Sequence, residues 1–220
     1  LIELGQPGPL LAFLKTPAPP AALRAALVAA DQLAGSPLQP GDVLPWLRSG
    51  SAPLPQTAGW IIAQRPAWGD ALAVFFRERL QAPPADTAER AALQAQLTSL
   101  ASSPAVQQAL AGALTEAPAA GRGLAADILA RASLREAPAV WLEALARRIP
   151  AATEAELPAL VQAARAQRLP KGGHVGLVSA LSRVGADPKV PAALRLEALA
   201  AAAAHAGTPE PDVLDFLLAH

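Results

Sequence analysis

Residues 193–207, ALRLEALAAAAAHAG, contain five consecutive alanines, and the fold of the chain depends on what this stretch becomes. Alanine and leucine are strong helix formers, so the stretch is predicted to be helical. It is too short and too polar to cross a membrane, which requires roughly 20 apolar residues, because Arg195, Glu197 and His205 surround the alanines. Alanines let neighbouring helix backbones approach closely at little cost in side-chain entropy. The stretch therefore predicts a helix packed between other helices, with only part of the alanine run buried.

The composition of the whole chain points to an all-α fold. Of its 220 residues, 52% are hydrophobic and 16% charged, which is far too apolar for a disordered chain. Aromatic residues make up only 4%, and the residues that favour strands are few. Eighteen basic residues balance 18 acidic ones, so we expect no nucleic-acid partner. The absence of cysteine excludes disulfides, thiolate catalysis and c-type haem attachment within these residues.

Helix-start signals divide the chain into short segments. Many of the 23 prolines stand at the edges of segments with helical periodicity, where proline is tolerated as the first helical residue. Ser103-Pro104 is such a start. The spacing of a capping box, in which two side chains bind the free amides of a helix start, occurs at three places: Asp86/Glu89, Ser133/Glu136 and Thr153/Glu156.

The predicted helices form two interleaved series. Helices of the first series are expected to start 32 to 38 residues apart, near Pro20, Pro55, Thr87, Ala120, Thr153 and Pro191. The second series carries apolar pairs four residues apart, at Val43/Leu47, Ala71/Phe75, Val106/Leu110, Trp141/Leu145, Leu177/Leu181 and Val213/Leu217. A two-helix unit of this size cannot bury its own apolar face and must stack on its neighbours. We expect one all-α domain over residues 1–220, an α-solenoid of about six antiparallel helix pairs, irregular around residues 36–70.

Four segments resemble the second helix of HEAT repeats, in which an aliphatic residue and an arginine precede small residues at helical spacing and a glycine. LRAALVAADQLAG (23–35) and LRLEALAAAAAHAG (194–207) fit this pattern, and GRGLAADILARA (121–132) and ERAALQAQLTSLA (89–101) fit it more loosely. The equivalent arginines are Arg24, Arg90, Arg122 and Arg195. They could form a row that binds carboxylates or phosphates of a partner, or each could bridge to the adjacent repeat. The second interpretation is favoured.

The remaining polar candidates are better explained by structure than by chemistry. His174 lies in the loop LPKGGHVG (169–176), which lacks the residue order of a phosphate-binding loop. Glu154 and Glu156 are expected in a first helical turn, where negative charge is favoured, rather than in acid–base catalysis. Trp46, Trp60 and Trp68 are expected in a local core with Phe75 and Phe76. We predict no catalytic residue, no metal site and no cofactor.

The leading hypothesis is a non-catalytic scaffold that binds a partner protein or flanking domains of its own chain. Leu1, in place of methionine, suggests an internal piece of a longer protein. The degenerate alanine- and proline-rich repeats, ending in PDVLDFLLAH (211–220), also resemble the helical middle of large, membrane-bound dehydrogenase-like proteins of planctomycete-type bacteria. Those proteins carry a sugar-dehydrogenase propeller and a c-type haem domain. The resemblance implies a spacer segment with a periplasmic or extracytoplasmic location; otherwise the sequence leaves the compartment open.

Two other functions remain as alternatives. DNA glycosylases built on HEAT-like repeats use a basic concave surface with aromatic and acidic residues, which the zero net charge disfavours. A peptide-capturing protein of the tetratricopeptide kind would be expected to line its groove with asparagine and lysine, and the chain has no asparagine. The charge of the exposed groove discriminates these possibilities.

Overall fold

The protein is helical throughout the part of the chain that the structure describes. A computed structural model describes residues 8–51 and 53–206, and these contain α-helices and two short 3-10 helices but no strand. No helix within these residues is long and apolar enough to span a membrane. The helices are α1 (Gly8–Phe13), α2 (Pro20–Gln32), α3 (Pro40–Leu47), α4 (Pro53–Ala63), η1 (Pro66–Trp68), α5 (Gly69–Gln81), α6 (Thr87–Ser99), α7 (Pro104–Glu116), α8 (Ala119–Arg131), α9 (Ala139–Arg148), η2 (Ile149–Ala151), α10 (Leu157–Ala166), α11 (Val175–Ala186) and α12 (Ala192–Ala206).

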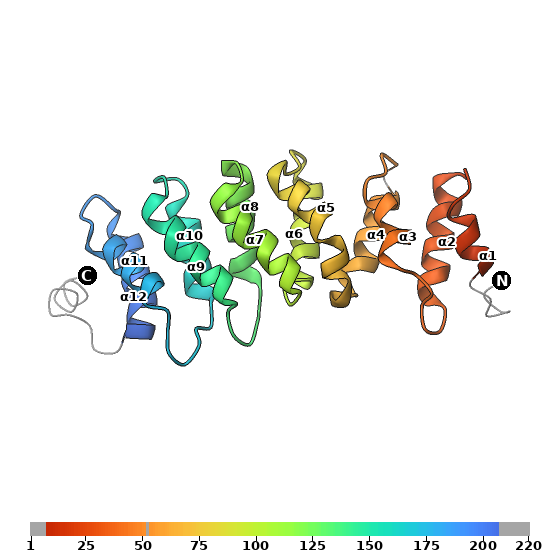
Figure 1. Ribbon diagram of the computed structural model, residues 1–220. Coiled ribbons are helices and arrows are strands. Elements are labelled where there is room, and N and C mark those ends of the chain that lie inside the picture. Colours follow the sequence, from red (N-terminus) through yellow and green to blue (C-terminus); the bar gives the residue numbers. More distant parts are fainter. Residues whose placement is uncertain (1–7, 52, 207–220) are drawn as a thin grey trace.

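The helices are arranged in two layers, and the helix pairs follow one another in a row (Figure 1). The even-numbered helices from α2 to α12 each pack on the next even-numbered helix, and the odd-numbered helices from α3 to α11 do the same. The main helix–helix contacts in the described chain join helices no more than three positions apart in sequence order. The molecule therefore has a core that runs along the row between the two layers.

The helix starts agree closely with the sequence pattern. Helices α2 and α6 begin at the predicted residues, Pro20 and Thr87, and α8 and α12 begin one residue away from prediction. The Asp86 carboxylate accepts a hydrogen bond from the Glu89 amide at 2.9 Å. The Ser103 hydroxyl accepts one from the Val106 amide at 3.3 Å. Both side chains therefore cap their helices, as the spacing predicts.

The other two predicted capping boxes are wrong as helix starts. Ser133 and Glu136 lie in a loop, and α9 begins only at Ala139. The preceding Ala137 amide donates instead to the Arg168 carbonyl at 2.8 Å, which ties this loop to the segment after α10. Helix α10 begins at Leu157, four residues later than predicted. The Glu156 carboxylate accepts from the Thr153 amide, as in a capping box, but it also binds two arginines.

The buried residues follow the predicted periodicity with one correction. The pairs Val106/Leu110, Trp141/Leu145 and Leu177/Leu181 are almost completely buried, as expected. Of the pair Ala71/Phe75, Phe75 is buried as predicted, whereas Ala71 is exposed at the edge of a buried face that includes Leu72 and Phe76. The predicted pair Val213/Leu217 lies outside the described residues.

The alanine run is partly buried, as predicted. Ala201 and Ala202 are buried, whereas Ala200 and Ala204 are exposed. A tight contact between α12 and α11 lies beside the run, where a Cβ on Gly185 would lie 2.3 Å from the Leu199 side chain. Leu199 therefore packs against a position of α11 that has no side chain.

A second glycine lies at a close contact between the two layers. A Cβ on Gly121 of α8 would lie 2.1 Å from the Leu80 carbonyl oxygen of α5 and 2.9 Å from the Ala117 Cβ. Backbone atoms cannot move aside as a flexible side chain can, so this position requires glycine. Two residues along the same helix, a Cβ on Gly123 would have no neighbour within 4 Å.

These two glycines provide a matched test of the packing. Gly121→Ala is expected to lower the free energy of unfolding by about 1–3 kcal/mol, because the added methyl group overpacks the contact. Gly123→Ala is expected to raise it by about 0.4–1 kcal/mol, since alanine favours the helix and nothing obstructs it. Urea unfolding monitored by circular dichroism measures both. Equal effects of the two substitutions would contradict the described contact between α5 and α8.

Candidate functional site

The four predicted arginines lie on four separate helices. Arg24 is on α2, Arg90 on α6, Arg122 on α8 and Arg195 on α12. All four belong to the even-numbered layer, and each lies in the first turn or the start of the second turn of its helix. Neither α4 nor α10 has an equivalent arginine, so the structure does not gather the four side chains into one cluster.

Three of these arginines contact a neighbouring helix or its end. Arg90 donates to the Ala120 carbonyl of α8 at 3.2 Å. Arg122 binds the Glu156 carboxylate, with its Nη2 atom 2.6 Å from Oε1, and also donates to the Ala117 carbonyl. The Nε atom of Arg195 donates to the Gly185 carbonyl at 2.8 Å. The contacts of these three side chains join helices of the chain to one another.

Arg24 differs from the other three. Its side chain is exposed, and it makes no hydrogen bond or ion pair with the described residues. A binding role for the whole row stays a prediction, since three of its four members already contact the chain itself.

Glu156, just before α10, is the centre of a largely buried charge cluster. Its carboxylate binds Arg122 and Arg148, and the Thr153 amide donates to it at 3.2 Å. Burial by itself raises the pKa of Glu156. The hydrogen bonds from Thr153, Arg122 and Arg148 and the charge of Arg148 outweigh this effect, and the pKa is lowered to about 2. The cluster therefore holds the start of α10 against the start of α8 and the end of α9. Glu154, predicted beside Glu156 in a helix, is exposed in the preceding turn.

Several contacts between helices could not be assigned from residue type alone. Arg65, at the end of α4, binds Asp31 of α2 and stacks on Trp68, with its guanidinium carbon 4.9 Å from the ring centroid. The Ser103 hydroxyl donates to the Asp70 carboxylate at 2.6 Å. The one feature of the sequence that could have indicated these contacts is the separation of the two partners, which is about one predicted repeat.

The histidine and tryptophan predictions have mixed outcomes. His174 caps α11, because its Nδ1 atom accepts a hydrogen bond from the Leu177 amide at 3.1 Å. Trp46 and Trp68 are partly buried against the core, as expected of a local cluster. Trp60 is 53% exposed, so its expected place in that cluster is wrong, because it projects from the outer face of α4. Trp141 is completely buried, and its indole N–H donates to the Gln107 carbonyl at 3.0 Å.

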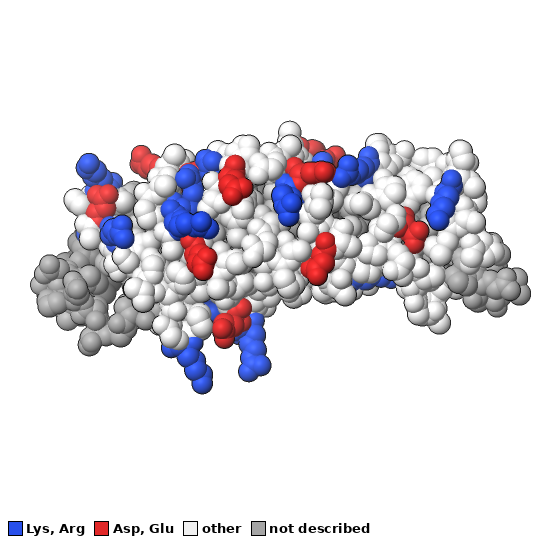
Figure 2. Space-filling view, viewed as in Figure 1, with Lys and Arg blue, Asp and Glu red and all other residues white. Residues whose placement is uncertain are grey.

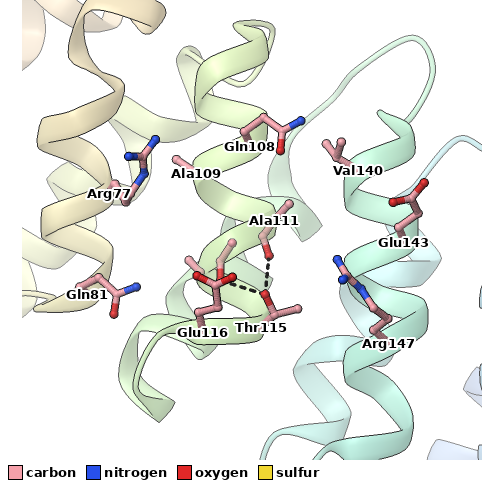
Figure 3. Close-up of a pocket in the computed structure, with 12 residues that line it drawn as sticks. Arg77, Gln81, Gln108, Ala109, Ala111, Thr115, Glu116, Val140, Glu143 and Arg147 are labelled. Atoms are coloured by element: carbon pink, nitrogen blue, oxygen red, sulfur yellow. Dashed lines mark hydrogen bonds between the residues drawn. The ribbon is translucent and has the colours of Figure 1, made fainter.

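A groove lies across three helices of the odd-numbered layer (Figure 3). Its volume is about 380 Å³. Helix α7 forms the floor with small residues, Ala109, Ala111, Gly112 and Ala113, and α5 and α9 form the two sides. A Cβ on Gly112 would have no neighbour within 4 Å, so the floor is open to solvent there. Thr115 also lines the groove, and its hydroxyl donates to the Gly112 carbonyl of its own helix at 3.1 Å.

The groove is polar and carries equal numbers of positive and negative side chains. Arg77 and Gln81 project from α5, and Glu143 and Arg147 from α9 (Figure 3). Helix α7 adds two more polar side chains, those of Gln108 and Glu116. Within the described chain, none of these six side chains has a hydrogen bond or ion pair. Elsewhere on the face shown in Figure 2, basic and acidic side chains are likewise interspersed. Sequence reasoning missed this site because its residues come from three helices and follow no motif.

No site for a metal ion is found among the described residues, where no group of three or more histidine, aspartate or glutamate side chains gathers. The charge cluster at Glu156 and the groove on α5, α7 and α9 are two polar arrangements of the described residues. In the cluster, the Glu156 carboxylate is already bound by other residues of the chain. In the groove, the charged side chains have no partner among the described residues.

The charge cluster predicts a specific pH dependence. Glu156 has a pKa lowered to about 2 from its ordinary 4.5, so its ion pairs stabilise the fold above about pH 4.5 and lose their effect as the pH falls toward 2. Glu156→Gln should lower the free energy of unfolding at about pH 7 by roughly 2–3 kcal/mol. The difference between wild type and variant should shrink below pH 4.5 and nearly vanish near pH 2.

Glu154→Gln is the matched control, because Glu154 is exposed and two residues away. Its unfolding free energy should equal that of the wild type at each pH. Urea unfolding across this pH range measures the three proteins. A Glu156→Gln deficit that persists unchanged down to pH 2 would mean that its carboxylate charge contributes nothing.

No protein-family model matches the sequence, and no curated protein or solved structure matches the chain. The resemblances to HEAT repeats and to the helical segment of dehydrogenase-like proteins therefore stay predictions.

Proposed function

We propose that the chain is a non-catalytic α-solenoid scaffold of about six HEAT-like helix pairs, which binds a partner protein on an exposed layer of helices. The observation that carries this proposal is the packing of each helix on the helix two positions away, in two layers (Figure 1). Such packing leaves one long face of each layer uncovered, and helical-repeat proteins use extended faces of this kind for binding.

The separations of contacts between helix pairs support a repeating unit. The Ser103–Asp70 hydrogen bond spans 33 residues, and the Arg122–Glu156 and Trp141–Gln107 bonds each span 34. The Arg90–Ala120 bond spans 30 and the Gln167–Leu129 bond spans 38. Four of these five spans fall within the 32 to 38 residues between predicted helix starts, and the Arg90–Ala120 span is two residues shorter. Different residue types thus connect successive helices of the same layer, as expected where units are stacked and their sequences have diverged.

The charge of the groove favours a scaffold over a glycosylase. A glycosylase groove would be strongly positive, to neutralise phosphates, and would contain aromatic and acidic residues. The groove on α5, α7 and α9 has two arginines and two glutamates, and neither a tryptophan nor an aspartate lines it. This balance suits contacts with a protein surface, where opposite charges pair across the interface.

Solution scattering tests the shape that the proposal requires. A compact domain of 220 residues would have a radius of gyration of about 17 Å. A row of six helix pairs spaced ~8–10 Å apart is ~50–60 Å long, so a larger radius is expected, with an asymmetric tail in the pair-distance distribution. A symmetric distribution with a radius near 17 Å would rule out the solenoid.

Site-specific photo-cross-linking tests the binding role. A photoreactive phenylalanine analogue replaces Gln108 in the groove, and in a second variant it replaces Ala95, an exposed residue of α6 in the other layer. In the native cells, the Gln108 variant should yield a discrete cross-linked protein and the Ala95 variant should not. Absence of any product from the groove position, or equal products from both, would contradict a scaffold that binds through this layer.

A further inference from the structure

We infer that the groove on α5, α7 and α9 binds an extended peptide segment of another protein, one that carries both an acidic and a basic side chain. This inference rests on the proposed scaffold function and specifies the chemistry of the partner. It starts from six of the seven polar side chains of the groove, which lie around one space of about 380 Å³ and have no partner in the described chain: Arg77, Gln81, Gln108, Glu116, Glu143 and Arg147.

The charges of the groove are held apart rather than paired. Arg77 and Arg147 lie on opposite sides, on α5 and α9, with Glu116 on α7 between those helices (Figure 3). No ion pair joins either arginine to either glutamate among the described residues, although all four line the same groove. By contrast, Arg48, Arg65 and Arg165 each pair with an acid on another helix. The groove therefore offers two fork-shaped donors and two carboxylates to an external ligand.

The two glutamines fit the main chain of a peptide. A side-chain amide has both donors and an acceptor, and it can therefore pair with the N–H and the carbonyl of an extended backbone. Gln81 lies on one side of the groove and Gln108 on its α7 floor helix (Figure 3). The absence of asparagine argued against peptide capture at the sequence level, but glutamine supplies the same chemical group.

The small floor favours an extended segment over a bulky one. Ala109, Ala111 and Ala113 are nearly buried, and a ligand over Gly112 would meet no side chain. In an extended peptide, alternate side chains point to opposite sides, so an acidic and a basic residue can reach different walls while the backbone lies on the floor. Charge complementarity with two arginines and two glutamates then requires both signs on the ligand.

Selection from a random peptide library tests this inference. Three helices spaced ~8–10 Å apart extend over ~25 Å, so peptides of about 12 residues, ~40 Å when extended, are long enough to cross the groove. The wild-type protein should enrich peptides that contain both an acidic and a basic residue. A synthetic peptide from the selection should bind at least roughly tenfold more weakly to the Arg147→Glu variant.

Arg131→Glu is the matched control. Arg131 is exposed near the end of α8 as Arg147 is near the end of α9, has no partner in the described chain, and does not line the groove. It should leave peptide affinity unchanged. Replacing the acidic residue of the peptide by lysine should restore binding to Arg147→Glu, which a variant that had merely lost its fold could not show.

The outcomes separate this inference from the proposed function. Four results would each overturn the peptide inference. The selection could enrich no peptides, or only peptides that lack charged residues. The Arg147→Glu variant could bind the selected peptide as tightly as the wild type does, or circular dichroism could show that the bound peptide is helical. If cross-linking from Gln108 still succeeded, the scaffold function would stand with a different occupant. Failure of both experiments would remove the groove as a binding site altogether.

Discussion

The structure depends on the packing of each helix against the helix two positions further along the chain. The helices from α2 to α11 are 8 to 13 residues long, and isolated helices of such length are marginal in water. Their stability must therefore come from neighbours on both sides and from the facing layer. Close contact between the layers can require a glycine, as at Gly121 against the Leu80 carbonyl.

Much of this fold is predictable from sequence, because it is encoded locally. Proline and capping residues mark helix starts such as those of α2, α6 and α7, and apolar pairs four residues apart identify the buried faces. The predictions fail where a contact with another helix overrides the local signal. Glu156 has the spacing of a capping residue, but two arginines bind its carboxylate and α10 starts later. Ala71 has the correct periodicity and its partner Phe75 is buried, but Ala71 itself lies at the exposed edge of the buried face of α5.

The candidate site was much less predictable than the fold. The arginines that share a sequence pattern, Arg90, Arg122 and Arg195, contact the chain itself, whereas Arg77 and Arg147 share none and lie free in the groove. A residue type that recurs in each helix pair is expected where that residue helps one pair to stack on the next. A binding residue has no reason to recur in every unit, since a partner contacts only some of them. Periodicity therefore identifies the structural arginines and leaves the groove residues unmarked.

The local nature of the helix contacts bears on how such a chain can change in length. The main contacts in the described chain join helices no more than three positions apart. A residue inserted into a connecting loop would therefore alter the contacts of the adjoining helix pairs and few others. Loops such as that between α10 and α11 can therefore lengthen or shorten during evolution without remaking distant contacts. Whole pairs could be gained or lost in the same way, and the reach of the molecule would change while each junction kept its form.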